Sequence, residues 1–307
     1  MKLLIPLLAV TVWALPAGAG TEPGDAPPAV DSLDNGEVVN YWLNGKAELT
    51  RYDLQQARYG ELRQGDAVLI FEARDFLPDE RIETDAPDRK KTGALPVLKL
   101  SFTKEFNTGV NPYSIMTSVY TPLQIGEHPR SLAADTSVQE WSGHSWLKLD
   151  LRDDGYEATR HSRLESEAIE SLELEATWLE DEIWTRIRLA PSTLPTGMVN
   201  MIPGGEQSRL RHRALAAESA KVTLEERSEG EMVYAIRYPA SERKLAIRFE
   251  KAFPHAILGW EEWYRDAVGA SGLNQTTKAT RAESIRLDYR NLNGNDDASW
   301  RKKLGLD

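Results

Sequence analysis

One short segment of the chain combines the side-chain types that acyl transfer needs. Glu140, Ser142 and His144 stand close together in the sequence, around Trp141 and Gly143. A serine hydroxyl becomes a nucleophile when a histidine takes its proton and a carboxylate orients that histidine. The same residues are also typical of a tight turn between two strands, with the glycine at the bend. We favour the turn, because triads are assembled in space rather than along the chain, and keep an envelope hydrolase as an alternative.

Other catalytic or metal-binding patterns are sparse in this sequence. Its histidines never occur at the H-x-H or H-E-x-x-H spacing that binds metals, and it contains no G-x-S-x-G nucleophile elbow. It also has no cysteine, which excludes thiol catalysis and cysteine-bound zinc or iron–sulfur clusters. We therefore expect no metal and no cofactor, and the balance favours a protein that is not an enzyme.

The aromatic residues suggest a different function, the binding of an apolar ligand. Tryptophan, tyrosine and methionine side chains on the inner face of a curved sheet can line an apolar pocket. The candidate ligand-binding residues are Trp42, Tyr113, Met116, Tyr120, Trp141, Trp146, Trp178 and Trp184. Large aromatic side chains also fill ordinary protein cores, so an open cavity and a filled core remain alternatives.

The elements that must position these residues are mainly strands. Apolar residues alternate with polar ones along Leu98–Phe106, Leu147–Leu151, Met232–Tyr238 and Leu245–Phe249. This period of two is typical of antiparallel strands that bury one face and leave the other in water. Many such strands joined by short turns predict a mainly β fold, a large curved antiparallel sheet in the form of a half-barrel.

A single amphipathic helix is expected within this sheet, at about residues 177–189. Thr177 and Glu180 have the spacing of a capping box, in which each side chain bonds the backbone of the other residue. Ile183 and Ile187 lie one helical turn apart on a common face. We expect this helix to pack across the concave face of the sheet or to fill one end of it.

The first residues have the pattern of a secretory signal. Lys2 precedes the apolar run Leu3–Leu15, and Ala17 and Ala19 give the A-x-A arrangement that signal peptidase recognises. The run is shorter than the roughly 20 residues that cross a bilayer. We therefore expect a signal peptide over residues 1–19 and export to the periplasm, with secretion as the alternative.

Two further segments complete the expected organisation. Residues 20–36 are rich in proline, glycine and aspartate and predict a flexible linker. Residues 37–307 are expected to form a single β-rich domain. The formal net charge of −11 disfavours nucleic acid as a partner, and no segment after the signal has the length and hydropathy of a transmembrane helix.

Six short motifs distributed along the chain carry a family resemblance. They are Tyr41–Glu48, Gln56–Glu61, Thr108–Ser114, Gln139–His144, Glu180–Trp184 and Leu304–Leu306. Together they resemble a family of exported bacterial proteins that often carry the label septum formation inhibitor Maf. The label does not suit this chain, because true Maf proteins are cytoplasmic nucleotide pyrophosphatases with an N-terminal phosphate loop, and nothing here matches that loop. The resemblance implies an exported protein and supplies no catalytic residues.

A looser similarity concerns the order of elements. The chain has long strands, then a helix that begins with acidic and ends with basic residues, then a turn with a glycine. This order is similar to that of half-barrel periplasmic proteins, among them the lipoprotein carriers that hold acyl chains. Fold similarity alone says little about function. We therefore expect a non-catalytic binding, carrier or chaperone-like role for a hydrophobic ligand, an acyl chain or an envelope protein. The alternatives are the hydrolase and a structural or interaction protein with a filled core.

Overall fold

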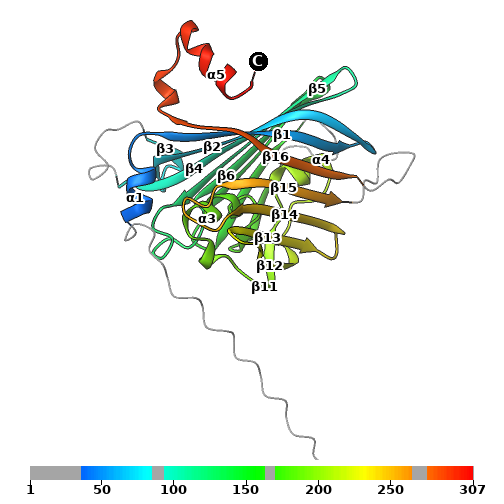
Figure 1. Ribbon diagram of the computed structural model, residues 1–307. Helices are drawn as coiled ribbons and strands as arrows, with labels where there is room; N and C mark the ends of the chain where they lie inside the picture. The colour runs from blue at the N-terminus through cyan, green and yellow to red at the C-terminus, as the bar shows by residue number, and fades with distance from the viewer. Residues whose placement is uncertain (1–35, 85–92, 163–169, 265–274, 307) are drawn as a thin grey trace, which may run out of the picture.

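The computed structural model describes residues 36–84, 93–162, 170–264 and 275–306. Strands make up 58% of the described residues and helices 14%, so the predicted mainly β class is confirmed. The strands form one large, open, curved sheet (Figure 1). The predicted signal peptide lies outside the described residues, as does the linker apart from Gly36, which begins the first helix.

The sheet has 16 strands, and short helices accompany it. The strands are β1 (Ala47–Arg58), β2 (Glu61–Leu77), β3 (Ile82–Glu83), β4 (Leu95–Thr108), β5 (Asn111–Pro122), β6 (Ala133–Glu140), β7 (Gly143–Leu151), β8 (Gly155–His161), β9 (Glu170–Glu175), β10 (Trp178–Leu179), β11 (Gly197–Ile202), β12 (Glu218–Ser228), β13 (Glu231–Tyr238), β14 (Arg243–Glu250), β15 (Ile257–Tyr264) and β16 (Thr276–Leu287). The α-helices are α1 (Gly36–Trp42), α3 (Ile183–Leu189), α4 (Gly205–Leu210) and α5 (Ser299–Lys303). The 3₁₀ helices are η3 (Pro191–Thr193), η4 (Tyr289–Asn291) and η5 (Asn295–Ala298).

The strand order explains the curvature of the sheet. It runs β10-β11-β12-β13-β14-β15-β16-β1-β2-β4-β5-β6-β7-β8-β9, with β3 beside β2. Neighbours are antiparallel except β10 and β11. The edge strands β9 and β10 follow each other in the chain, separated only by Ala176 and Thr177. Since so few residues span at most roughly 11 Å, the sheet curls until its two edges approach each other there.

Two glycines allow neighbouring strands to come close where the sheet bends. A Cβ atom on Gly65 would lie 2.1 Å from the carbonyl oxygen of Glu105 on the next strand. Gly259 has a φ of +153°, and a Cβ atom there would lie 2.3 Å from the carbonyl oxygen of Ala279. The pairing of β14 with β15 also shifts register between Arg248 and Phe249, opposite this glycine. Glycines and bulges of this kind are how strongly curved sheets form.

The predicted helix at 177–189 is shorter than the sequence indicated. The helix α3 begins at Ile183, and Trp178 and Leu179 instead form β10 beside β11. The predicted capping box is wrong, because the Thr177 hydroxyl donates to the carbonyl of Asn200 at 2.6 Å. Pairing with a sheet edge therefore wins over a local cap. The expectation of one helix also misses the short helices α1, α4 and α5.

The core lies on the concave face, where α3 sits in the hollow of the sheet (Figure 1). Ile183 and Ile187 are fully buried there, as the spacing predicted. Phe102, Trp184 and Trp260 pack edge to face around a common point, with each pair of ring centroids 5.2 Å apart. Such aromatic contacts contribute beyond the area they bury.

Buried ion pairs join the α3 region to the sheet from inside. Arg243 donates from Nη2 to Glu180 at 2.6 Å and from Nε to Glu262 at 2.5 Å. Arg188 on α3 donates to both carboxylate oxygens of Glu48, at 2.5 and 2.7 Å. The side chains of all five residues are at most 5% exposed. The acidic residues at 180–182 thus belong to the interior and not to a solvated first helical turn.

The C-terminal segment lies on the outer face of the sheet, away from this core (Figure 1). Its residues Leu304 and Leu306 pack with Leu49 and Leu287 in a second, separate apolar cluster. None of the helices in the described ranges has the length and apolar composition that a membrane crossing needs.

Candidate functional site

The three catalytic candidates lie at the tight hairpin between β6 and β7. Ser142 and His144 are exposed, and among the described residues no hydrogen bond joins His144 to Ser142 or Glu140. Glu140 instead accepts a hydrogen bond from Asn111 at 2.7 Å and lies 3.7 Å from Arg209. Burial opposes its ionisation, but hydrogen bonds from Asn111 and Ser142 outweigh this and lower the pKa of Glu140. The arrangement is that of a hairpin turn, the interpretation that the sequence favoured.

We expect His144→Ala to change the free energy of unfolding by less than about 0.5 kcal/mol, because the side chain is exposed. Urea unfolding of both proteins measures this. The wild type and the His144→Ala variant also test the hydrolase alternative. Turnover of a p-nitrophenyl ester by the wild type that is lost in the variant would support that alternative.

The structure does not bring the eight candidate ligand-binding residues together. Trp42, Tyr113 and Trp184 are buried within the core. Met116 and Tyr120 lie three and seven positions after Tyr113 on β5. Because side chains alternate between the two faces of a strand, both point to the other, outer face of the sheet.

The other three tryptophans also have separate surroundings. Trp146 stacks on His161, with ring centroids 5.7 Å apart. Trp178 lies between Arg130 and Arg186, at 4.8 and 4.7 Å from the two guanidinium carbons. Trp141 is 71% exposed at a hairpin tip. These positions explain each residue without a shared ligand.

The concave face has little free space near α3. A cavity of about 30 Å³ lies between Trp184, Lys104, Arg243 and Glu262, and it is lined mostly by polar groups. That volume holds about one water molecule. Among the described residues, α3 and the aromatic side chains around it thus fill this part of the concave face.

An apolar pocket of about 370 Å³ lies instead on the outer face, beneath the C-terminal segment. Its size falls within the range of about 300–1,000 Å³ that is typical of small-molecule sites. The pocket is lined by Leu49, Asp66, Val68, Ile70, Thr103, Glu105, Ile285, Leu287, Tyr289, Leu292, Asp297, Trp300, Arg301, Leu304 and Leu306. We take it as the candidate functional site and call it the outer pocket.

The floor of the outer pocket comes from apolar residues at outward-facing positions of the strands. Val68 and Ile70 alternate along β2 with Leu69 and Phe71, which face the core. This segment is therefore apolar on both faces, which a solvated sheet does not need. The uninterrupted run from Val68 to Phe71 is the sequence signal that would have identified the pocket floor.

The cover of the pocket is fastened to the sheet at both ends. At its start, Arg290 donates to both oxygens of Glu72 at 2.8 Å, and Tyr289 donates to the same carboxylate at 3.0 Å. At its end, α5 has Leu304 as its C-cap, and Gly305 follows with a φ of +70°. The amides of Gly305 and Leu306 donate to the carbonyls of Lys302 and Arg301, which is a Schellman motif. This turn folds the end of the chain back over the pocket.

Charged groups also line the outer pocket. Asp66 accepts a hydrogen bond from Arg51 at 2.8 Å, and Glu105 lies on the adjacent strand. Asp297 and Arg301 come from the cover. Because apolar side chains make up most of its lining, the pocket is suited to hold an apolar molecule.

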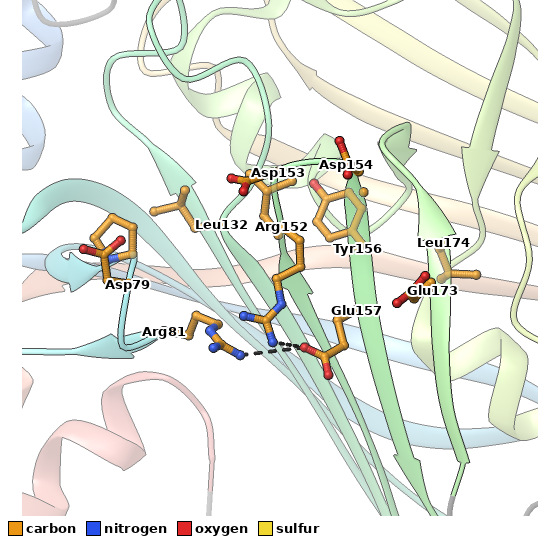
Figure 2. A pocket seen from close by; sticks show the side chains of 13 residues that line it. Asp79, Arg81, Leu132, Arg152, Asp153, Asp154, Tyr156, Glu157, Glu173 and Leu174 are labelled. Carbon is orange, nitrogen blue, oxygen red and sulfur yellow. Dashed lines mark ion pairs between the residues drawn. The ribbon is translucent and has the colours of Figure 1, made fainter.

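A larger and more polar hollow, of about 700 Å³, lies near β8. Figure 2 shows Arg81 and Arg152 both directed at Glu157, while Asp153 and Asp154 lie apart from this group. Arg81 and Arg152 are both paired with Glu157, and the described residues contain no group of three acidic or histidine side chains able to hold a metal. We assign no ligand to this hollow.

Comparison with known proteins adds nothing to this geometry. The chain matches no family model, no curated protein and no solved structure. The resemblance to an exported bacterial family stays a prediction from the motifs. The functional conclusion therefore depends on the outer pocket itself.

Proposed function

We propose that this protein is a non-catalytic binding protein that holds an apolar small molecule, such as an acyl chain, in the outer pocket. The observation that carries the proposal is an apolar pocket of about 370 Å³ partly covered by a separate chain segment. Burial of apolar ligand surface against Val68, Ile70, Leu287 and Trp300 supplies the binding free energy.

The construction of the cover supports reversible binding. Its last helix, α5, has five residues and is too short to be stable alone. It depends on the apolar contacts of Leu304 and Leu306 with the sheet. A ligand that enters between α5 and β2 replaces part of these contacts with its own. We propose that the protein does this after export, in the periplasm.

Filling the pocket tests the proposal. Val68 lies on the pocket floor and faces outward, so Val68→Trp places a bulky side chain where the ligand would lie. We expect the affinity for cis-parinaric acid, a fluorescent fatty acid, to fall at least tenfold, or about 1.4 kcal/mol. Fluorescence titration measures the affinity, and circular dichroism confirms that the variant folds.

Met116→Trp is the matched control. Met116 is exposed on the same face of the sheet, but it does not line the pocket. This variant should bind cis-parinaric acid like the wild type. Equal affinity of the wild type and the folded Val68→Trp variant would exclude the outer pocket as the site, and no binding at all would favour the structural or interaction protein.

A further inference from the structure

Three hairpin tips stand side by side at one end of the sheet. They join β1 to β2, β4 to β5, and β6 to β7, and these six strands are consecutive neighbours in the sheet. Neighbouring strands lie about 4.8 Å apart, so adjacent tips are about 10 Å from each other. Figure 1 shows the ends of β1 and β5 that carry two of these tips on the right of the molecule.

Exposed apolar side chains concentrate on these tips. Among the described residues, seven large hydrophobic side chains are exposed, and four of them are at the tips. The four are Tyr59 (41% exposed), Leu62 (43%), Val110 (80%) and Trp141 (71%). Single exposed apolar residues are common, but four on adjacent turns form a patch, which marks an interaction site.

Contacts between the tips keep this patch in place. The Tyr59 hydroxyl lies 3.1 Å from the hydroxyl of Tyr113 on β5. The Asn111 side chain donates to Glu140 at 2.7 Å and accepts from the amide of Trp141 at 2.9 Å. The three turns are thus bonded to one another, and they cannot fold back to bury their apolar side chains.

Arginines stand directly beside the tips. The segment Arg209–Arg213 contains the last two residues of α4 and the three that follow. It is held there, because Arg58 donates to the carbonyl of Leu210 at 2.5 Å and Arg209 donates to Ser145 at 2.9 Å. We define the tip surface as residues 58–62, 109–111, 140–143 and 209–213. It contains four arginines and two glutamates, a formal charge of +2 on a chain whose net charge is −11.

The tip surface combines tryptophan and tyrosine side chains with arginines, and this combination indicates the kind of partner that it fits. Tryptophan and tyrosine side chains favour the boundary between lipid headgroups and acyl chains, where one end of the ring is apolar and the other wet. Arginine binds phosphate oxygens with its planar fork of donors. A surface that offers both in adjacent positions is complementary to a phospholipid headgroup layer and its phosphates.

We propose that the tip surface docks this protein on a phospholipid membrane, with Trp141 and Val110 inserted among the headgroups and Arg211 and Arg213, neither of which is buried, on lipid phosphates. The docking is peripheral, because only hairpin turns reach the lipid. It is independent of the outer pocket, whose lining contains none of the four exposed tip residues. Acidity of the chain as a whole does not oppose it, since charges beyond about 10 Å are screened in physiological salt.

Vesicle flotation tests the proposal with matched double variants. The tip variant Val110→Ser/Trp141→Ser removes two exposed apolar residues from the tip surface. The control Ile82→Ser/Met198→Ser removes two other exposed apolar residues, 53% and 63% exposed, from β3 and β11, outside it. All of these proteins carry the same N-terminus, so any contribution of Leu3–Leu15 to vesicle binding is the same in each. On vesicles of phosphatidylethanolamine and phosphatidylglycerol, we expect the tip variant to bind at least tenfold less than the control.

A second measurement follows Trp141 itself. Brominated acyl chains quench tryptophans that reach the membrane, so vesicle binding should quench the wild type, and Trp141→Phe should remove most of that quenching. Arg211→Ser/Arg213→Ser should weaken binding to the anionic vesicles more than to phosphatidylcholine vesicles. Absence of Trp141 quenching, or equal flotation of the tip and control variants, would overturn the proposal and leave a protein as the partner of the tip surface.

Discussion

Replacing Arg243 by methionine should lower the free energy of unfolding by about 3–5 kcal/mol, because it leaves Glu180 and Glu262 buried without a cation. Burial by itself raises the pKa of Glu180, but Arg243 reverses this and holds that pKa below its usual value. Without the guanidinium, each carboxylate must either take up a proton or stay ionised in the desolvated interior, and both states cost free energy. Urea unfolding at neutral pH measures the loss.

Two further variants separate this effect from a general loss of packing. Arg237→Met changes an exposed arginine on the neighbouring strand β13 and should alter stability by less than about 0.5 kcal/mol. Adding Glu180→Gln to Arg243→Met removes one stranded charge and should recover part of the loss. If Arg243→Met were as stable as Arg237→Met, the buried ion pairs would not hold the interior together.

The strands were predictable from the sequence because each depends on a local pattern. Leu98–Phe106 and Leu245–Phe249 alternate in hydrophobicity, and both lie within strands, β4 and β14. Alternation reports which face is buried whatever the partner strand is. The sequence could not show that Trp178 and Leu179 would join a sheet edge, because their partner Met201–Ile202 lies far along the chain.

The buried charges were misinterpreted for a related reason. Glu180, Asp181 and Glu182 before an apolar face are typical of a solvated helix start. Only in the folded chain does Arg243 contact Glu180. Glu182 likewise accepts a hydrogen bond from the hydroxyl of Ser131, at 2.8 Å. A charged residue in a sequence carries no mark that it will be buried, since burial depends on partners distant in the chain.

The outer pocket follows from the alternation of apolar residues and not from the positions of the aromatic ones. Tyr113 and Met116 fall on opposite faces of β5, which their spacing already implies. The apolar run from Val68 to Phe71 breaks alternation and marks a strand that is covered on both sides. What covers it, the segment from Tyr289 to Leu306, could not be deduced from that run.

The stability of the protein should also depend on the protonation of Asp181. Burial raises the pKa of Asp181 to about 7, and the negative charges of Glu180 and Glu206 add to the effect. A hydrogen bond from the amide of Gly205, at 3.0 Å, and the charge of Arg243 act in the opposite direction without cancelling it. The carboxyl group therefore holds a proton more tightly in the folded protein than in the unfolded chain.

The sign of the pH dependence follows from this difference. The proton stabilises the folded state fully below the unfolded pKa of about 4, and this stabilisation is lost as the pH rises through about 7. Asp181→Asn keeps an oxygen acceptor for Gly205 but cannot ionise. Relative to this variant, the wild type should lose stability between about pH 4 and pH 7, with a slope that approaches 1.4 kcal/mol per pH unit, or about one proton.

Urea unfolding of both proteins at several pH values in this interval measures the slope. The other titrating groups are present in both proteins, so most of their contribution cancels in the difference. Among them, Asp135 has a pKa that burial raises to about 6, whereas the pKa of Glu48 is lowered by Arg188 against the effect of burial. Asp53→Asn, at an exposed position, is the control and should follow the wild type. A wild-type curve parallel to that of Asp181→Asn would show that Asp181 ionises normally, and the desolvated cluster around Gly205 would then be open to water.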